Sequence, residues 1–285
     1  MPINSSGQGY SENTPSKQEN FRYFIDIHLG ICKGIFDKAR DQFWLSHKYH
    51  YIDLNAGPGI TEEYGEGSPV IFLKEAMKRQ VTSRCYFVDV NASVIDELKK
   101  NISEFPCQAE YFPYTNHIAL ENISETLKQH YGKRKKKLYG LLYSDENGIV
   151  PFDELAQVFS QDQWKTIDIL VYFSGTTIKR CLKAFGSDSS YNYRRLTEYI
   201  GKLPKTHWQI RQPAEADKHQ WSFLFGTNWD VKGKMGYPPI TQANFYDIKS
   251  SKGERILEYL AHTNKEIQQK SQPLITGFDE LMGND

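Results

Sequence analysis

A short apolar segment that runs into a glycine-rich turn constrains the fold of this chain more than any other feature. Tyr51–Leu54 has the composition of a buried strand that ends in an acid, Asp53, and Asn55-Ala-Gly-Pro-Gly59 follows it as a turn of small residues. Glycine tolerates positive φ and has no Cβ, so a ligand can lie directly against the main chain of such a turn. Ligands of open α/β sheets bind at the carboxyl ends of the strands. The segment therefore predicts an α/β fold with a binding site at the glycine turn.

A second apolar segment, further along the chain, also ends in an acid. Ser83–Val90 predicts a strand whose end carries Asp89. A carboxylate at that place can accept hydrogen bonds from both hydroxyls of a ribose. The turn lacks the Gly-x-Gly-x-x-Gly pattern of pyrophosphate binders, which weighs against a dinucleotide oxidoreductase. Asp53-Leu-Asn-Ala-Gly-Pro-Gly59 instead resembles the first motif of S-adenosylmethionine-dependent methyltransferases, whose cofactor has no phosphates.

Helical and strand-like segments alternate through the middle of the chain. Helices are expected over residues 18–44, 69–79, 92–101, 117–131 and 151–159, and further strands over residues 110–114, 138–144 and 167–173. Residues 208–212 and 220–225 alternate in hydropathy like antiparallel strands, and residues 245–248 predict a last short strand. Five strands that alternate with helices make a doubly wound, mostly parallel sheet the economical solution.

We therefore expect an α/β, Rossmann-like class I methyltransferase fold with a mostly parallel seven-stranded sheet. An N-terminal helix and a small C-terminal helical extension are added to it. Residues 1–17 are polar and predicted to be a disordered leader, residues 18–248 the α/β domain, and residues 249–285 a C-terminal helix and tail. Lys17, at the end of the leader, is interpreted as a solvated lysine rather than a functional one.

The composition sets wider limits on the function and the location of the protein. Lys plus Arg and Asp plus Glu both number 35, so no field of the whole molecule favours nucleic acid or membrane. The sequence shows no signal peptide and no apolar run of the ~18 residues that a membrane span needs. The dispersed cysteines Cys32, Cys85, Cys107 and Cys181 predict reduced thiols in a cytoplasmic protein. The eight histidines are scattered, so no metal site is expected.

Several segments, in order, resemble the three-Cys-motif partner proteins, a family of bacteria and phages regarded as S-adenosylmethionine-dependent methyltransferases. The matching segments are the N-terminal helix after Lys17, Asp53–Gly59, Gly67-Ser-Pro69, the strand that ends at Asp89, Asp145-Glu-Asn-Gly148, Asp168 to Arg180 and Phe225-Gly-Thr-Asn228. The resemblance covers roughly residues 17 to 260. No single motif is diagnostic, and the ordered set carries the likeness. It implies S-adenosylmethionine as the cofactor and a protein partner.

The expected cofactor site combines the turn with the ends of the next two strands. Asp53 would act on the amino-acid end of the cofactor through the turn, and Asp89 would hold the ribose. In the fold that the resemblance implies, Tyr114–Asn116 would flank the adenine. An alternative role for Asp89 is to cap the next helix. The expected cofactor contacts are Asp53, Asn55, Ala56, Gly57, Gly59, Ser68, Asp89, Val90, Tyr114, Thr115 and Asn116.

Methyl transfer from a sulfonium requires two positioned reactants and sometimes the removal of a proton. Asp145 and Asn147, in the polar turn after the fourth parallel strand, are the candidates for orienting or deprotonating the methyl acceptor.

The sequence departs from the family pattern at two places in the expected site. Tyr114–Asn116 lacks the acid that family members carry before the asparagine, and Glu146 and Asn147 replace a proline and an aromatic residue. A divergent substrate and a loss of activity both remain open.

The acceptor itself is not specified, and nucleic acid, protein and small molecule all remain open. A non-catalytic protein that binds nucleic acid or a partner is the competing class. The basic turn 133–137 precedes a strand, so it should lie opposite the cofactor edge. A late mixture of aromatic and basic residues suits single-stranded nucleic acid, although a core role for the tryptophans is favoured. These residues are Trp208, Arg211, Lys218, His219, Trp221, Trp229, Lys232 and Lys234.

Overall fold

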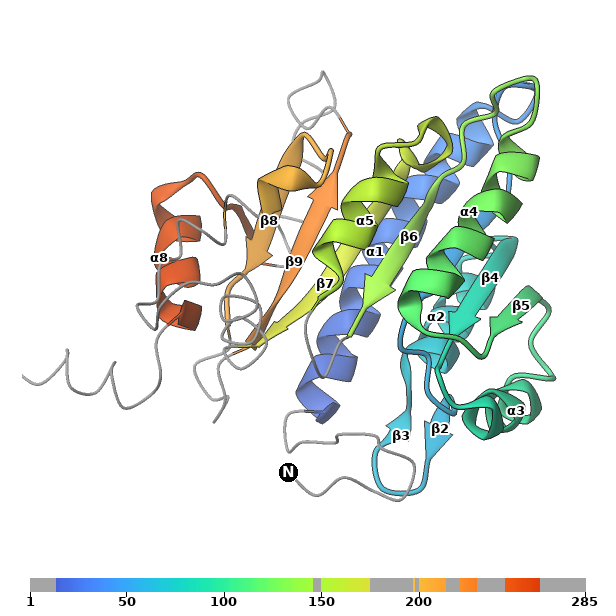
Figure 1. Ribbon diagram of the computed structural model, residues 1–285, viewed down its shortest axis with the longest axis horizontal. Helices are drawn as coiled ribbons and strands as arrows, with labels where there is room; N and C mark the ends of the chain where they lie inside the picture. Colours follow the sequence, from blue (N-terminus) through green and yellow to red (C-terminus); the bar gives the residue numbers. More distant parts are fainter. Residues whose placement is uncertain are drawn as a thin grey trace, which may run out of the picture.

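An eight-stranded sheet forms the centre of the computed structural model, which describes residues 14–145, 150–174, 197, 200–213, 221–229 and 244–261 (Figure 1). The strand order is β10-β8-β9-β7-β6-β1-β4-β5. The strands are β1 (Tyr49–Asp53), β4 (Ser83–Val88), β5 (Gln108–Phe112), β6 (Gly140–Ser144), β7 (Ile167–Ser174), β8 (His207–Arg211), β9 (Trp221–Thr227) and β10 (Phe245–Asp247). A separate two-stranded hairpin, β2 (Ile60–Thr61) and β3 (Gly65–Glu66), follows the glycine turn.

The order in which the chain adds parallel strands to the sheet reverses at β1. Strands β5, β4, β1, β6 and β7 are parallel neighbours, and β9, β8 and β10 extend the sheet with antiparallel pairings. The chain runs outward from β1 to β4 and β5 and then returns to β6 on the other side of β1. The loops after β1 and β6 therefore diverge, which opens a crevice at the carboxyl edge of the sheet.

The mostly parallel α/β fold and the antiparallel pair β8–β9 confirm the sequence prediction, but the expected count of seven strands is wrong. The eighth strand is β10, which pairs with β8 from Phe245 opposite Arg211. The sequence does predict a short strand here. Its three residues do not show by themselves whether they join the main sheet.

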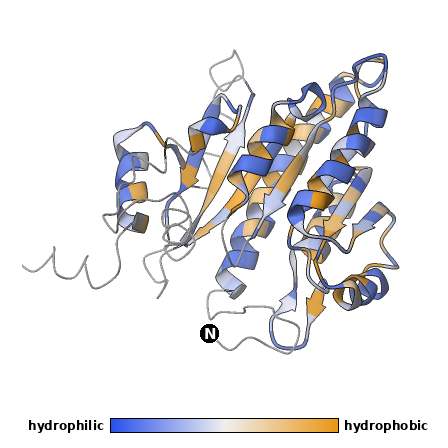
Figure 2. Cartoon of the chain, in the orientation of Figure 1, coloured by the Kyte–Doolittle hydropathy of each residue, from blue (hydrophilic) through white to orange (hydrophobic). Residues whose placement is uncertain are grey.

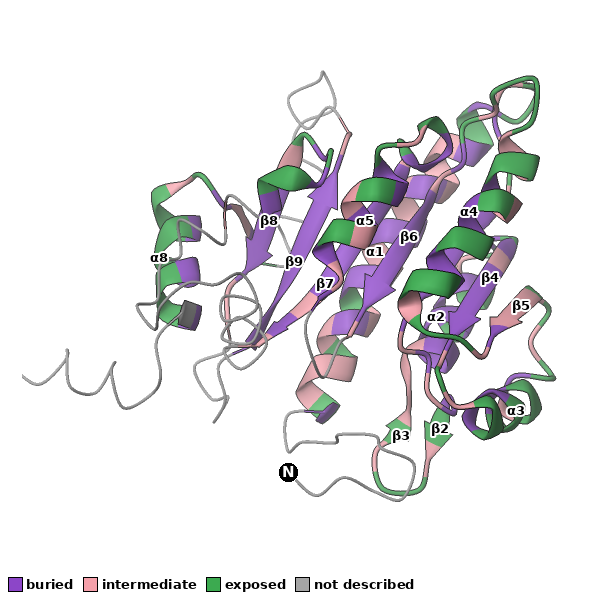
Figure 3. Ribbon diagram, viewed as in Figure 1, coloured by how far each residue is buried: buried purple, intermediate pink, exposed green. Residues whose placement is uncertain are grey.

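Helices cover both faces of the sheet. The helices are α1 (Thr14–Lys38), α2 (Ser68–Lys78), α3 (Ala92–Asn101), α4 (Asn116–Tyr131), α5 (Phe152–Phe159) and α8 (Ser251–Ala261), with the 3-10 turn η1 (Asp162–Trp164). Buried residues of α1, α2 and α3 share one apolar cluster, and those of α4, α5 and α8 share the other. Because both faces are covered, β1 and β6 are buried along their whole lengths. Figure 3 shows this for β6. The strands are correspondingly apolar between helices of mixed hydropathy (Figure 2).

Helix α1 differs from its prediction at both ends. It begins at Thr14, so residues 14–17 belong to the helix and not to a disordered leader. It ends at Lys38, before the predicted end at Trp44. Residues 1–13 and most of the predicted C-terminal tail lie outside the described part of the chain.

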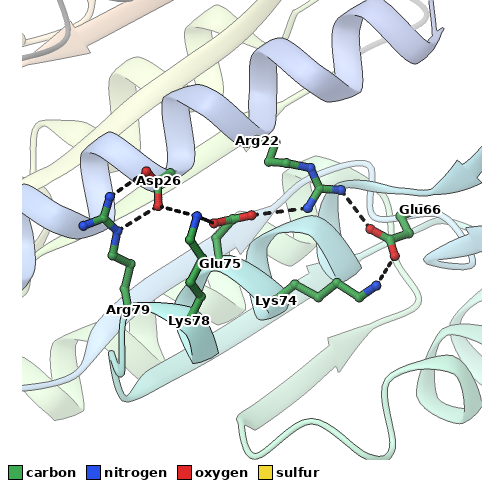
Figure 4. A network of polar contacts seen from close by, with 7 residues as sticks. All are labelled: Arg22, Asp26, Glu66, Lys74, Glu75, Lys78 and Arg79. Atoms are coloured by element: carbon green, nitrogen blue, oxygen red, sulfur yellow. Dashed lines mark hydrogen bonds and ion pairs between the residues drawn. The ribbon is translucent and has the colours of Figure 1, made fainter.

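Helix α1 is attached to α2 by a network of ion pairs (Figure 4). One ion pair of this network is bidentate: Arg79 donates hydrogen bonds to both carboxylate oxygens of Asp26, at 2.7 and 2.6 Å. Arg22 joins Glu75 of α2 to Glu66 of the hairpin. The full network comprises Arg22, Asp26, Glu66, Lys74, Glu75, Lys78 and Arg79. The network fixes the first half of α1 beside the glycine turn.

Several expectations from composition can be compared with the described residues. Cys32 and Cys85 are buried free thiols and Cys107 is a partly exposed one, whereas Cys181 lies outside the described residues. Among the helices that the structure describes, none has the length and apolar character to cross a membrane. The described residues also contain no cluster of three or more His, Cys, Asp or Glu side chains suited to a metal ion.

Candidate functional site

A cleft of about 340 Å³ opens at the carboxyl ends of β1, β4, β5 and β6. It lies where the strand order reverses, the place at which open α/β sheets bind their ligands. The first turns of α1 and the start of α2 complete its walls. The structure brings these predicted site residues together in its lining: Asn55, Ala56, Gly57, Gly59, Ser68, Asp89, Val90, Tyr114, Thr115, Asn116 and Asp145. Asp53 is not part of the lining, and Asn147 lies outside the described residues.

The glycine turn has the backbone that its sequence requires. Gly57 and Gly59 adopt φ values of 61° and 80°, a region that side chains with a Cβ rarely enter. A Cβ on Gly59 would lie 2.8 Å from the side chain of Leu98. The Ala56 N–H donates to the Val88 carbonyl at 2.9 Å, which joins the turn to the end of β4. The turn is therefore a fixed backbone surface that faces the cleft.

Asp53 stabilises the glycine turn from the side that faces away from the cleft. Its side chain is fully buried and accepts hydrogen bonds from the Tyr51 hydroxyl at 2.8 Å and from the Asn55 N–H at 3.2 Å. Burial raises the pKa of its carboxyl from 3.8 to about 6, and a hydrogen bond from Ser68 opposes the increase. Any effect of Asp53 on a ligand would therefore pass through the turn, as the sequence predicts.

Asp89 makes the helix-capping contact that the sequence predicts as an alternative, and it also lies in the lining of the cleft. Its carboxylate accepts a hydrogen bond from the Asn91 N–H at 2.9 Å, just before α3, and its side chain also lines the cleft. Burial raises the pKa of Asp89, whereas hydrogen bonds from the Asn91 and Gly57 backbones lower it. The contact with Gly57 places the carboxylate beside the glycine turn.

Apolar side chains stand exposed next to Asp89. Val90, which follows β4, is 71% exposed, and Tyr114, which follows β5, is 45% exposed, and both line the cleft. Large apolar side chains exposed in a cleft are typical of surfaces that a ligand covers. They provide a site for a flat apolar group such as a nucleobase beside the carboxylate.

An ion pair borders the cleft on the other side of the turn. The Lys17 ammonium lies 2.6 Å from a carboxylate oxygen of Asp145, and the two side chains are 22% and 18% exposed. The Asp145 N–H donates to the side-chain oxygen of Asn55 at 3.1 Å, which links the ends of β6 and β1. The interpretation of Lys17 as a solvated lysine in a leader is therefore wrong. Its helical start and its partner depend on packing that the local sequence does not specify.

The late aromatic and basic residues do not extend the site within the described part of the chain. Trp208 is 6% exposed and Trp221 is fully buried, which confirms their core role. Lys218, His219, Lys232 and Lys234 lie outside the described residues. The basic turn 133–137 lies just before β6, at the edge of the sheet opposite the cleft, as the sequence predicts.

No protein-family model matches the sequence, and no curated protein matches it. Three similar solved structures illustrate how distant the matches are. A chain of the fibrillarin/Nop5p complex is 12% identical with a TM-score of 0.38, and the match covers 65% of this chain and 75% of that one. The CMeT domain of the citrinin polyketide synthase is 10% identical with a TM-score of 0.43 over 64% and 46% of the two chains. A SAM-dependent methyltransferase from Agrobacterium tumefaciens is 8% identical with a TM-score of 0.41 over 78% and 64%. Similarity at this level carries no argument about function, which has to come from the cleft.

Proposed function

We propose that the cleft binds S-adenosylmethionine and that the protein transfers its methyl group to an acceptor that is still unidentified. The observation that carries this proposal is the arrangement around the glycine turn. Asp89 supplies a carboxylate beside that turn, with Val90 and Tyr114 exposed next to it. A ribose on Asp89 would place its base against the two apolar side chains.

The charges of the cleft favour a sulfonium over a nucleotide with phosphates. Among its described lining residues, Lys17 is the cationic side chain and Asp89 and Asp145 are the anionic ones. Lys17 is already paired with Asp145, so the lining carries a net negative charge. A pyrophosphate would be repelled by this field, whereas a cationic sulfonium would be attracted. A dinucleotide cofactor is therefore disfavoured.

The side chains of the cleft bind and orient rather than form covalent bonds. Asp89 would accept from the ribose hydroxyls, and the Gly57 backbone would allow the ligand to approach closely. When bound, S-adenosylmethionine supplies an electrophilic methyl group for an in-line displacement. Proximity and orientation account for much of the acceleration of such a step. Asp145 and Asn147 remain proposed contacts of the acceptor.

Calorimetric titration with S-adenosylhomocysteine tests the proposal. Asp89→Ala should weaken binding by about 1–3 kcal/mol, because the ribose hydroxyls lose a charged, partly buried acceptor. Asp96→Ala is the matched control, since Asp96 lies on the nearby helix α3 with its side chain 66% exposed. Its dissociation constant should equal that of the wild type.

Two results would contradict the proposal: no binding by the wild type, or equal affinities of the wild type and Asp89→Ala. The competing non-catalytic function predicts the same binding. Incubation with a radiolabelled methyl donor and separate nucleic-acid, protein and small-molecule fractions distinguishes the two functions, because only a methyltransferase labels a fraction.

A further inference from the structure

The two ends of the cleft differ in chemistry. Strand order places β4 and β5 on one side of β1 and β6 on the other. The exposed Val90 and Tyr114 therefore lie on one side of the glycine turn, and the Lys17–Asp145 ion pair lies on the other. S-adenosylmethionine has the same asymmetry, with a nucleoside at one end and a zwitterionic amino acid at the other.

The ion pair is held in place from several directions. Besides the contact of its backbone with Asn55, Asp145 lies close to the hydroxyl of Tyr143, whose pKa is raised by burial and also by the charge of Asp145. The Lys17 ammonium lies 5.0 Å from the ring centre of Tyr172. One turn further along α1, the ring of Phe21 packs 4.5 Å from that of Tyr143. A positive and a negative group are thus positioned side by side at the wall of the cleft.

Attachment of α1 to the rest of the fold does not require this pair. The helix is already fixed by the network with α2 and by the buried contact of His28 with Asp168. A partly exposed ion pair adds little to stability, typically about 0–1 kcal/mol. Its position in the lining of the cleft is better explained by a ligand.

We propose that Lys17 and Asp145 together recognise the amino-acid end of the cofactor, an inference that rests on the function proposed above. Lys17 binds the α-carboxylate and Asp145 binds the α-ammonium. A zwitterion carries both groups on one carbon, so its entry exchanges one Lys–Asp contact for two complementary contacts and leaves the net charge of the protein groups unchanged. This inference reassigns Asp145 from the acceptor, where it was placed above, to the cofactor, and leaves Asn147 as the proposed acceptor contact.

This assignment makes the N-terminal helix a determinant of ligand class. The Asp89 end recognises any adenosine, whereas the Lys17–Asp145 end selects adenosine thioethers that carry an α-amino acid. Nucleosides without that tail leave the ion pair intact and gain nothing from it.

Four adenosine thioethers test the assignment by calorimetry. S-adenosylhomocysteine has both charged groups, its deaminated analogue has the carboxylate alone, its decarboxylated analogue has the ammonium alone, and 5′-methylthioadenosine has neither. Lys17→Met should weaken S-adenosylhomocysteine and the deaminated analogue about tenfold, or ~1.4 kcal/mol, and leave 5′-methylthioadenosine within about twofold. It should not weaken the decarboxylated analogue, whose ammonium no longer competes with Lys17 for Asp145. Asp145→Asn should weaken S-adenosylhomocysteine and the decarboxylated analogue instead.

Two further variants separate recognition from general damage. Lys33→Met changes an exposed lysine of the same helix, which pairs with Asp37, and should bind all four ligands as the wild type does. Lys17→Arg keeps the positive charge and should retain most of the affinity for the deaminated analogue.

The inference is overturned if Lys17→Met weakens all four ligands equally, or none of them, while the wild type still binds 5′-methylthioadenosine. In that case the nucleoside site survives and only the role of the ion pair falls. If the wild type binds none of the four, the proposed function fails and the inference fails with it.

Discussion

Helix α1 contacts two carboxylates, Asp168 in β7 and Asp145 just after β6, and the two contacts differ in depth. His28 Nε2 lies 3.0 Å from the Asp168 carboxylate of β7, and both side chains are at most 1% exposed. The Tyr49 hydroxyl lies 2.7 Å from the other ring nitrogen of His28. The Lys17–Asp145 pair lies at the cleft, with about a fifth of each side chain exposed. The same helix therefore presents one pair to the core and one to solvent.

The different burial of the two contacts predicts that one stabilises the fold and that the other binds a ligand. A buried pair whose partner is removed leaves a charge without compensation, which is strongly destabilising. A pair that water reaches is screened, and its groups can exchange partners at low cost. The buried pair should therefore maintain the fold, and the cleft pair should be free to respond to a ligand.

The largest effect is expected for His28→Ala. It removes the partner of the Asp168 carboxylate inside the core, so the free energy of unfolding should fall by about 3–5 kcal/mol. Urea denaturation followed by circular dichroism measures the change. Adding Asp168→Asn should restore part of the stability, because the unpaired charge is gone. A loss below about 1 kcal/mol for His28→Ala would remove the distinction between the two pairs.

A second test of the buried region uses Lys205, which is 7% exposed and donates to the carbonyl of Ile167. Burial lowers the pKa of its ammonium from 10.5 to about 8, and Asp168 opposes the decrease. The pKa of Lys205 is lower in the folded state than in the unfolded state. Its contribution to the free energy of unfolding is therefore fully present above pH 10.5 and is lost as the pH falls through 8.

The stability of the wild type relative to Lys205→Met should therefore rise between pH 8 and pH 10.5, by on the order of 3 kcal/mol. Paired urea titrations at several pH values cancel the titration of other groups. Parallel pH profiles of the two proteins would show that the lysine is not desolvated in the fold.

The smallest effect on stability is expected for Lys17→Met. Loss of a partly exposed ion pair should change the free energy of unfolding by about 0–1 kcal/mol. The same variant should lose affinity for S-adenosylhomocysteine. Lys17→Met should therefore affect mainly ligand binding, and His28→Ala mainly the free energy of unfolding. A loss of stability comparable with that of His28→Ala would make Lys17 a structural residue.

The sequence predicts the part of the site that depends on neighbours in the chain. The glycine turn, Asp89 and Tyr114–Asn116 each follow a strand, and parallel strands bring such ends to one edge. Their presence in one cleft could be expected without a structure.

The partners of α1 could not be predicted in the same way. Lys17 meets Asp145 across 128 residues, and His28 meets Asp168 across 140. The hydropathy pattern shows which face of a helix is buried, but it does not determine the position of the helix along the strands of the sheet. The polar residues from Thr14 to Lys17 also have the composition of a linker, although they form the first turn of the helix.

A crystal structure with S-adenosylhomocysteine tests the central claim most directly. We predict the adenine against Val90 and Tyr114, the ribose hydroxyls within hydrogen-bond distance of Asp89, and the amino-acid end between Lys17 and Asp145. An empty cleft at saturating ligand would contradict the proposed function. Adenine at the Lys17 end would contradict the orientation on which the role of the ion pair depends.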